Sequence, residues 1–212
     1  MIIDHNHPGY RKRWWTSAGK FNGAFFYSKE IVKNIIPRVK TDRNWLTVNT
    51  YDECPNHTIV FIHNNKRPEN YDWLKKAQDL VLVCGVPETC QKVAHLGKTV
   101  YLPLSVDVAD VEHFKRIKTK DTAYVGRAEK TRGTKLPNPV IMLCGMERNK
   151  LLEKMAEYKK VYAVGRCAIE AKVLGCEVLP FDPRFPDPGF WQVLDNKDAA
   201  KILQKELDEI DG

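Results

Sequence analysis

Short runs of β-branched residues alternate with helical segments along this chain, and the alternation limits the folds open to it. TIVFIH (58–63), LVLVC (80–84) and TVYLPL (99–104) are continuous apolar runs, as in strands buried on both faces. WLTVN (45–49) is a shorter candidate strand, and helical patterns occupy 71–78 and 88–96. This order of strands and helices predicts a parallel α/β sheet.

The alternation stops in a polar stretch at 111–121 and then starts again. We predict strands at 122–126, 140–145, 160–165 and 177–181, and helices at 148–158, 167–174 and 197–210. The expected fold is therefore α/β, with two small Rossmann-like lobes whose parallel sheets face a cleft. Its predicted parts are an N-terminal lobe (1–110), a linker (111–121), a C-terminal lobe (122–195) and a C-terminal helix (196–212).

An earlier helix is predicted from an apolar face at Ile31, Val32, Ile35 and Ile36. Ser28 stands directly before this pattern, where a side-chain oxygen can cap the helix, and Pro37 stands where the helix should stop.

Positive charge gathers at the start of the chain. The net charge is +7, and residues 1–50, with nine bases and three acids, account for +6 of it. This asymmetry is typical of a surface that binds a polyanion such as DNA, where aromatic rings beside cations can stack on bases. The predicted patch comprises Arg11, Lys12, Arg13, Trp14 and Trp15. The alternative is a solvated basic face with both tryptophans packed inward.

Composition also excludes several classes. No apolar run approaches the roughly 20 residues that span a bilayer, and no apolar stretch follows the N-terminal basic cluster as in a secretory signal. Six cysteines occur without a CxxC pair, so we expect free thiols in a reducing compartment rather than a disulfide framework or a zinc site. We therefore expect a soluble, cytoplasmic protein with no bound metal.

The turn after the predicted strand 122–126 combines glycine with cations. Gly126 and Arg127 end the strand, and Lys130, Arg132 and Gly133 follow. Glycine lets the backbone approach a phosphate, and guanidinium groups bind phosphate oxygens in a fixed fork. The turn is either a phosphate site or an exposed basic loop.

A second candidate is the helix that begins after Gly165. Its first residues, starting with Arg166, offer free backbone N–H groups and a positive dipole end to an anion. Glu170 lies between Ile169 and Ala171 in an apolar stretch, where its carboxylate could accept hydrogen bonds from a ribose diol. The alternative is a carboxylate that only complements the helix dipole.

Three segments together resemble the GT-B glycosyltransferases. VYLPLSVDVADVEHF is similar to the segment between their lobes, YVGRAEKTRG to the start of their second lobe, and AIEAKVLGCEVL to their acidic donor motif. The resemblance covers roughly residues 80–182, and the first lobe is shorter than is usual in that family.

The resemblance implies a nucleotide-sugar donor site in the second lobe. Arg127, with Arg132 in the position usually held by lysine, would neutralise the donor diphosphate, and Glu170 would hold the ribose hydroxyls. No bound cofactor or metal is implied. Tyr162 stands where many retaining members carry a further acid that contacts the sugar. The acceptor is open; an anionic one such as DNA or a phosphorylated glycan would suit the basic N-terminus, as in a DNA-modifying transferase of viral type.

An inverting enzyme would need a general base, and the sequence leaves several candidates open. They are Asp4, His5, His7, His63 and Asp107. The alternative function is a non-catalytic protein that keeps the two lobes and binds a nucleotide or nucleic acid. A dinucleotide-dependent enzyme is disfavoured because no GxGxxG follows a predicted strand.

Overall fold

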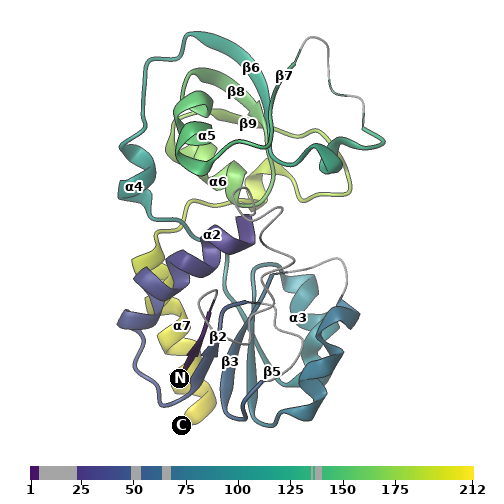
Figure 1. The fold of residues 1–212 in the computed structure, drawn as a ribbon, viewed down its shortest axis with the longest axis vertical. Helices are drawn as coiled ribbons and strands as arrows, with labels where there is room; N and C mark the ends of the chain where they lie inside the picture. Colours follow the sequence, from purple (N-terminus) through teal and green to yellow (C-terminus); the bar gives the residue numbers. More distant parts are fainter. Residues whose placement is uncertain (5–22, 49–53, 64–67, 135, 137–139) are drawn as a thin grey trace. The chain divides into compact units, whose positions relative to one another are not determined.

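The computed structural model describes residues 1–4, 23–48, 54–63, 68–134, 136 and 140–212. The chain divides into two units (Figure 1). Met1–Pro103 and Asn196–Gly212 form the first unit, and Leu104–Asp195 forms the second. The segment predicted as a linker, 111–121, thus lies within the second unit, while the C-terminal helix belongs to the first.

The first unit is built on a sheet of five parallel strands whose spatial order follows the chain. The central strands β3 and β4 are buried at every residue, as their continuous apolar runs predicted. The strands are β1 (Ile2–Ile3), β2 (Asn44–Leu46), β3 (Thr58–Ile62), β4 (Leu80–Cys84) and β5 (Lys98–Tyr101).

The helix predicted to begin after Ser28 starts earlier, so the prediction of Ser28 as its cap is wrong. Helix α2 (Gly23–Glu30) contains Ser28 and continues through a π-helical turn, Ile31–Ile35, into a 3-10 turn, Ile36–Arg38. The Ser28 hydroxyl is buried and shares a 2.9 Å hydrogen bond with the Thr47 hydroxyl. It therefore joins the helix to the chain after β2 instead of capping a helix end.

The other helices of this unit include the C-terminal one. They are the 3-10 helix η4 (Pro68–Lys76), α3 (Pro87–Val93), the 3-10 turn η5 (Ala94–Leu96) and α7 (Asn196–Asp211). Gln204 of α7 accepts from the Lys40 backbone N–H at 2.6 Å and donates to its carbonyl at 3.1 Å. Lys98 Nζ donates to the Ile210 carbonyl at 2.9 Å. These side-chain hydrogen bonds thus fix α7 against the rest of the first unit.

An ion-pair cluster lies at the amino-terminal ends of the strands of this unit. His57 directly precedes β3, and its two ring nitrogens lie 2.5 Å from Asp79 and 2.9 Å from Asp42. Buried Arg43 binds both Asp79 and Asp211, the last residue of α7. A neutral imidazole has a single N–H, so only a protonated ring donates to both aspartates. The hydrogen bonds to Asp79 and Asp42 accordingly raise the pKa of His57.

The second unit has a sheet of four parallel strands in the order β7-β6-β8-β9. Its strands are β6 (Lys120–Val125), β7 (Ile141–Leu143), β8 (Tyr158–Tyr162) and β9 (Glu177–Leu179). Its helices are α4 (Val108–Glu112), α5 (Arg148–Met155), α6 (Arg166–Val173) and the 3-10 turns η6 (Ala128–Thr131) and η7 (Pro188–Phe190). The α/β class with parallel sheets is thus confirmed in both units.

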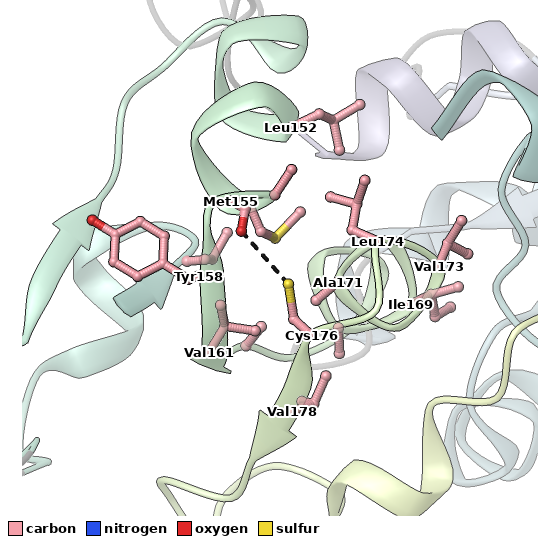
Figure 2. Packing of buried hydrophobic residues seen from close by; sticks show 14 of the residues in the cluster. Leu152, Met155, Tyr158, Val161, Ile169, Ala171, Val173, Leu174, Cys176 and Val178 are labelled. Carbon is pink, nitrogen blue, oxygen red and sulfur yellow. Dashed lines mark hydrogen bonds between the residues drawn. The ribbon is translucent and has the colours of Figure 1, made fainter. Parts of the chain in front are cut away.

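Helices α5 and α6 pack on the sheet of the second unit through a shared apolar core (Figure 2). Leu152 and Met155 of α5 meet Val161 of β8 and Ile169 of α6, all at most 1% exposed. Cys176 adds a buried thiol that donates to the Met155 carbonyl at 3.5 Å (Figure 2). This core holds the start of α6 in a fixed place beside the strand ends.

Candidate functional site

The strand order of the second unit marks where a ligand would bind. From β6 the chain passes to β7 on one side and then returns to β8 on the other. Ligands of open parallel sheets bind at such a reversal, beyond the carboxyl ends of the strands. In this unit the reversal lies between β6 and β8, so Gly126 and Gly165 follow the two strands concerned. The five described strands of the first unit have no reversal.

The turn after β6 needs glycine at its first position. Gly126 has a φ of +145°, and a Cβ there would lie 3.1 Å from the Tyr124 hydroxyl. That hydroxyl donates to the Arg127 carbonyl at 2.8 Å and so stabilises the turn. The Arg127 side chain is exposed. The structure therefore places Arg127 just after the strand end at the reversal, where the sequence predicts a phosphate contact.

The rest of the basic turn is tied to the loop after β9. Arg184 donates to the Arg132 carbonyl at 2.8 Å and to the Thr134 hydroxyl at 3.1 Å. Asp182 accepts from Arg184 Nε at 2.9 Å and from the Thr134 hydroxyl. Its carboxylate is 3% exposed, and the bonds from Arg184 and then Thr134 hold its pKa well below the ordinary value. The Lys130 ammonium lies 5.7 Å from the centre of the Phe185 ring.

Glu170 lies in a buried ion-pair cluster. Its Oε1 accepts from Arg166 Nε at 3.0 Å and from Arg148 Nε at 3.2 Å. Arg148 also donates to exposed Asp110 at 2.9 Å. Glu170 is 4% exposed and Arg166 9%. Both bonds use Oε1; among the described residues none is made to Oε2. Paired guanidinium groups, rather than the helix dipole alone, thus compensate the buried carboxylate.

Charges from three segments act together at the first turn of α6. Burial is the main cause that raises the pKa of the Cys167 thiol to about 11, and the negative charge of Glu170 adds to it. The positive charges of Lys130, Arg166 and Arg148 oppose this rise. Gly165, with a φ of +64°, turns the chain from β8 into this helix end. Two of these three cations, Arg166 and Arg148, are paired with Glu170, while the N–H groups and the dipole at the start of α6 favour an anion.

A cavity of about 280 Å³ opens beside the same strand ends. Ala163 and Val164, which follow β8, form one wall. The other wall is the proline-rich segment that ends β9 and continues to η7. It consists of Leu179, Pro180, Phe181, Asp182, Pro183, Phe185, Pro186, Asp187 and Pro188.

Three of the five candidate bases predicted from the sequence lie in the described part of the chain, Asp107, His63 and Asp4. Asp107 caps α4 by accepting from the Asp110 N–H at 3.1 Å. His63 follows β3 in the first unit, its Nε2 lies 2.7 Å from the Thr47 carbonyl, and burial lowers its pKa. Asp4 follows β1. The described residues contain no group of three or more His, Cys, Asp or Glu suited to a metal ion.

Several predicted positions lie outside the described residues. They are His5, His7 and the basic patch of Arg11, Lys12, Arg13, Trp14 and Trp15. No helix in the described part of the chain has the length and apolar character needed to cross a membrane.

Sequence reasoning missed four charged residues of this region. The sequence predicts Arg148 only as the start of a helix, and Asp110 only as the last residue of the N-terminal lobe. Asp182 and Arg184 lie between the predicted strand 177–181 and the predicted helix 197–210, where the sequence predicts no site. A signal was available for the last two, since an acid and an arginine two positions apart in a rigid proline loop can bind each other.

The comparisons with known proteins give no relative for this arrangement. Neither family models, curated proteins nor solved structures produced a match to the chain.

Proposed function

We propose that the chain is a minimal GT-B-like glycosyltransferase that binds a nucleotide-sugar donor in its second unit. The observation that carries the proposal is the coincidence, at one sheet reversal, of exposed Arg127 with the amino end of α6. A diphosphate is the group that such a set of donors suits, since guanidinium groups and helix N–H groups both bind phosphate oxygens.

The proposed role of the cations is electrostatic. As the bond between sugar and diphosphate breaks, negative charge grows on the leaving diphosphate. Arg127 and Arg132, together with the amino end of α6, would stabilise that charge more in the transition state than in the bound donor. No bound metal or cofactor is part of the proposal. The sugar moves to an acceptor whose chemistry is open, with DNA or an anionic glycan as candidates.

The proposed role of Glu170 is to hold the ribose diol. Its Oε1 is shared by two arginines, so the carboxylate is fixed in position before a ligand arrives. A preorganised acceptor loses little side-chain entropy on binding. We therefore assign the diol contact to Oε2, the oxygen that makes no hydrogen bond to a described residue.

The second candidate function is a binding protein without catalysis. Tyr162 stands where the resemblance leads us to expect a further acid, and this substitution favours a chain that keeps the donor site but not the reaction. It would bind a nucleotide or nucleic acid.

Two measurements test the proposal. Thermal shift and titration calorimetry with UDP, GDP, dTDP and their sugar conjugates should identify one base whose diphosphate binds. Slow release of that diphosphate from its sugar conjugate then separates an enzyme from a binder, which releases none. Failure of every nucleotide to bind refutes the proposal.

The acceptor is tested separately with duplex DNA. Binding driven by phosphate contacts weakens steeply with salt, so a mobility shift at low salt should be lost at higher salt. Absence of a shift at low salt removes DNA as acceptor.

A further inference from the structure

The cavity beside β8 and β9 has a wall that is poor in hydrogen-bond donors. Four of its lining residues are prolines, Pro180, Pro183, Pro186 and Pro188, and proline has no backbone N–H. Its side chains include no hydrogen-bond donor, and their polar groups are the carboxylates of Asp182 and Asp187. A ligand that fits here must therefore present donors, such as hydroxyl groups, and also C–H surface for the apolar side chains.

The two carboxylates on the wall differ in availability. The Asp182 side chain is 3% exposed and is committed to Arg184 and Thr134. Asp187 is exposed, and within the described residues its carboxylate has neither a hydrogen bond nor an ion pair. Only its backbone carbonyl is used, accepting from the Phe190 N–H at 2.9 Å. The Asp187 carboxylate is therefore available to a ligand in the cavity.

The aromatic rings of the cavity are already engaged with protein groups. Phe185 stacks on Phe181 with 5.8 Å between ring centres and an interplanar angle of 29°. Lys130 and Arg184 also lie over the Phe185 ring, at 5.7 Å and 6.0 Å. A nucleobase would need a free ring face for stacking. A pyranose needs only C–H contacts from proline rings and ring edges.

The size of the cavity agrees with a single sugar ring. Pockets for drug-sized ligands range over about 300–1,000 Å³. A cavity of about 280 Å³ lies just below that range and has no room for a whole nucleotide sugar. A nucleotide sugar bound here would place only one of its parts in the cavity, with the diphosphate outside, by Arg127 and α6.

We propose that this cavity holds the sugar ring of the donor and that Asp187 binds its hydroxyl groups. The inference rests on the proposed function, because it takes the ligand to be a nucleotide sugar. It adds a binding residue that the sequence did not single out, on a loop held in place by the Asp182–Arg184 pair. No covalent step is assigned to Asp187; it accepts hydrogen bonds and so orients the ring.

The test compares two kinds of ligand on two variants by titration calorimetry. The ligands are a free diphosphate and its conjugate: UDP with UDP-glucose and UDP-N-acetylglucosamine, GDP with GDP-mannose, and dTDP with dTDP-glucose. Asp187→Asn should weaken the conjugate that binds about ten- to hundredfold, the effect of losing a charge-assisted hydrogen bond, and leave the diphosphate unchanged. Asp121→Asn is the matched control, because Asp121 is exposed on β6 of the same unit and outside the cavity wall.

The outcomes separate this inference from the proposed function. If no diphosphate or conjugate binds the unmodified protein, both fail. If the ligands bind and Asp187→Asn leaves the conjugate unaffected, or weakens diphosphate and conjugate equally, the sugar assignment alone is wrong. A selective loss for the conjugate in Asp187→Asn but not in Asp121→Asn supports it.

Discussion

Removal of the Glu170 carboxylate should destabilise the second unit strongly. Glu170→Ala leaves Arg166, 9% exposed, without the acceptor of its Nε, while Arg148 keeps its bond to Asp110. Breaking a buried pair by removal of one partner costs about 3–5 kcal/mol, and we expect the lower value because Arg148 keeps its bond to Asp110. A loss of about 3 kcal/mol lowers Tm by roughly 6–12 °C if the whole chain melts together, and by roughly 12–24 °C if the second unit melts alone.

Differential scanning calorimetry and urea unfolding followed by circular dichroism measure this loss. Glu177→Ala is the matched control, since Glu177 on β9 pairs with Lys160 at 3.5 Å and both side chains are exposed. Such a surface pair contributes at most about 1 kcal/mol. Glu170→Gln should be destabilised nearly as much as Glu170→Ala. The glutamine keeps the shape of the side chain but removes the negative charge that compensates the arginines. A melting curve for Glu170→Ala within 2 °C of the control would refute the reasoning.

Three further predictions concern other parts of the chain. Arg127→Ala should keep its Tm and bind the diphosphate identified by calorimetry about ten- to hundredfold more weakly; unchanged affinity would show that Arg127 is not a phosphate ligand. The raised pKa of His57 means that its stabilising contribution is fully present below the unfolded pKa and is lost as pH rises through the folded one. The Tm difference between His57→Gln and the unmodified chain, measured by thermal melts, should therefore be larger at pH 6 than at pH 9, and a constant difference would contradict this. Gly165→Ala should lose about 1–3 kcal/mol in urea unfolding because its φ is +64°, whereas Gly189→Ala, which meets no atom within 4 Å, should lose less; equal losses would contradict the assignment of strain.

The parts of the fold that followed from sequence are those decided by local pattern. Strands β3 and β4 were predicted because a continuous β-branched run has one good way to bury both its faces. The helix predicted at 167–174 begins one residue earlier, at Arg166, because Gly165 supplies the left-handed turn that starts it. Ser28 shows where local pattern fails. A serine before an apolar helical face suits a cap, but a buried hydroxyl with Thr47 as partner is equally satisfied inside the helix.

The candidate site likewise has a part that local sequence predicts and a part that it does not. Gly126 and Arg127 were placed at a strand end correctly, because a strand and its following turn are adjacent in sequence. The environment of Glu170 was not predictable in this way, since Arg148 lies 22 residues away on another helix and meets it only once α5 and α6 pack on a common core. This packing changes what mutation of Glu170 reports. Mutation of an exposed acid that binds a ligand would lower the affinity alone. Mutation of the buried Glu170 would also lower the stability of the protein. Asp187 and Arg127, both exposed, are therefore the residues at which ligand binding can be tested without that second effect.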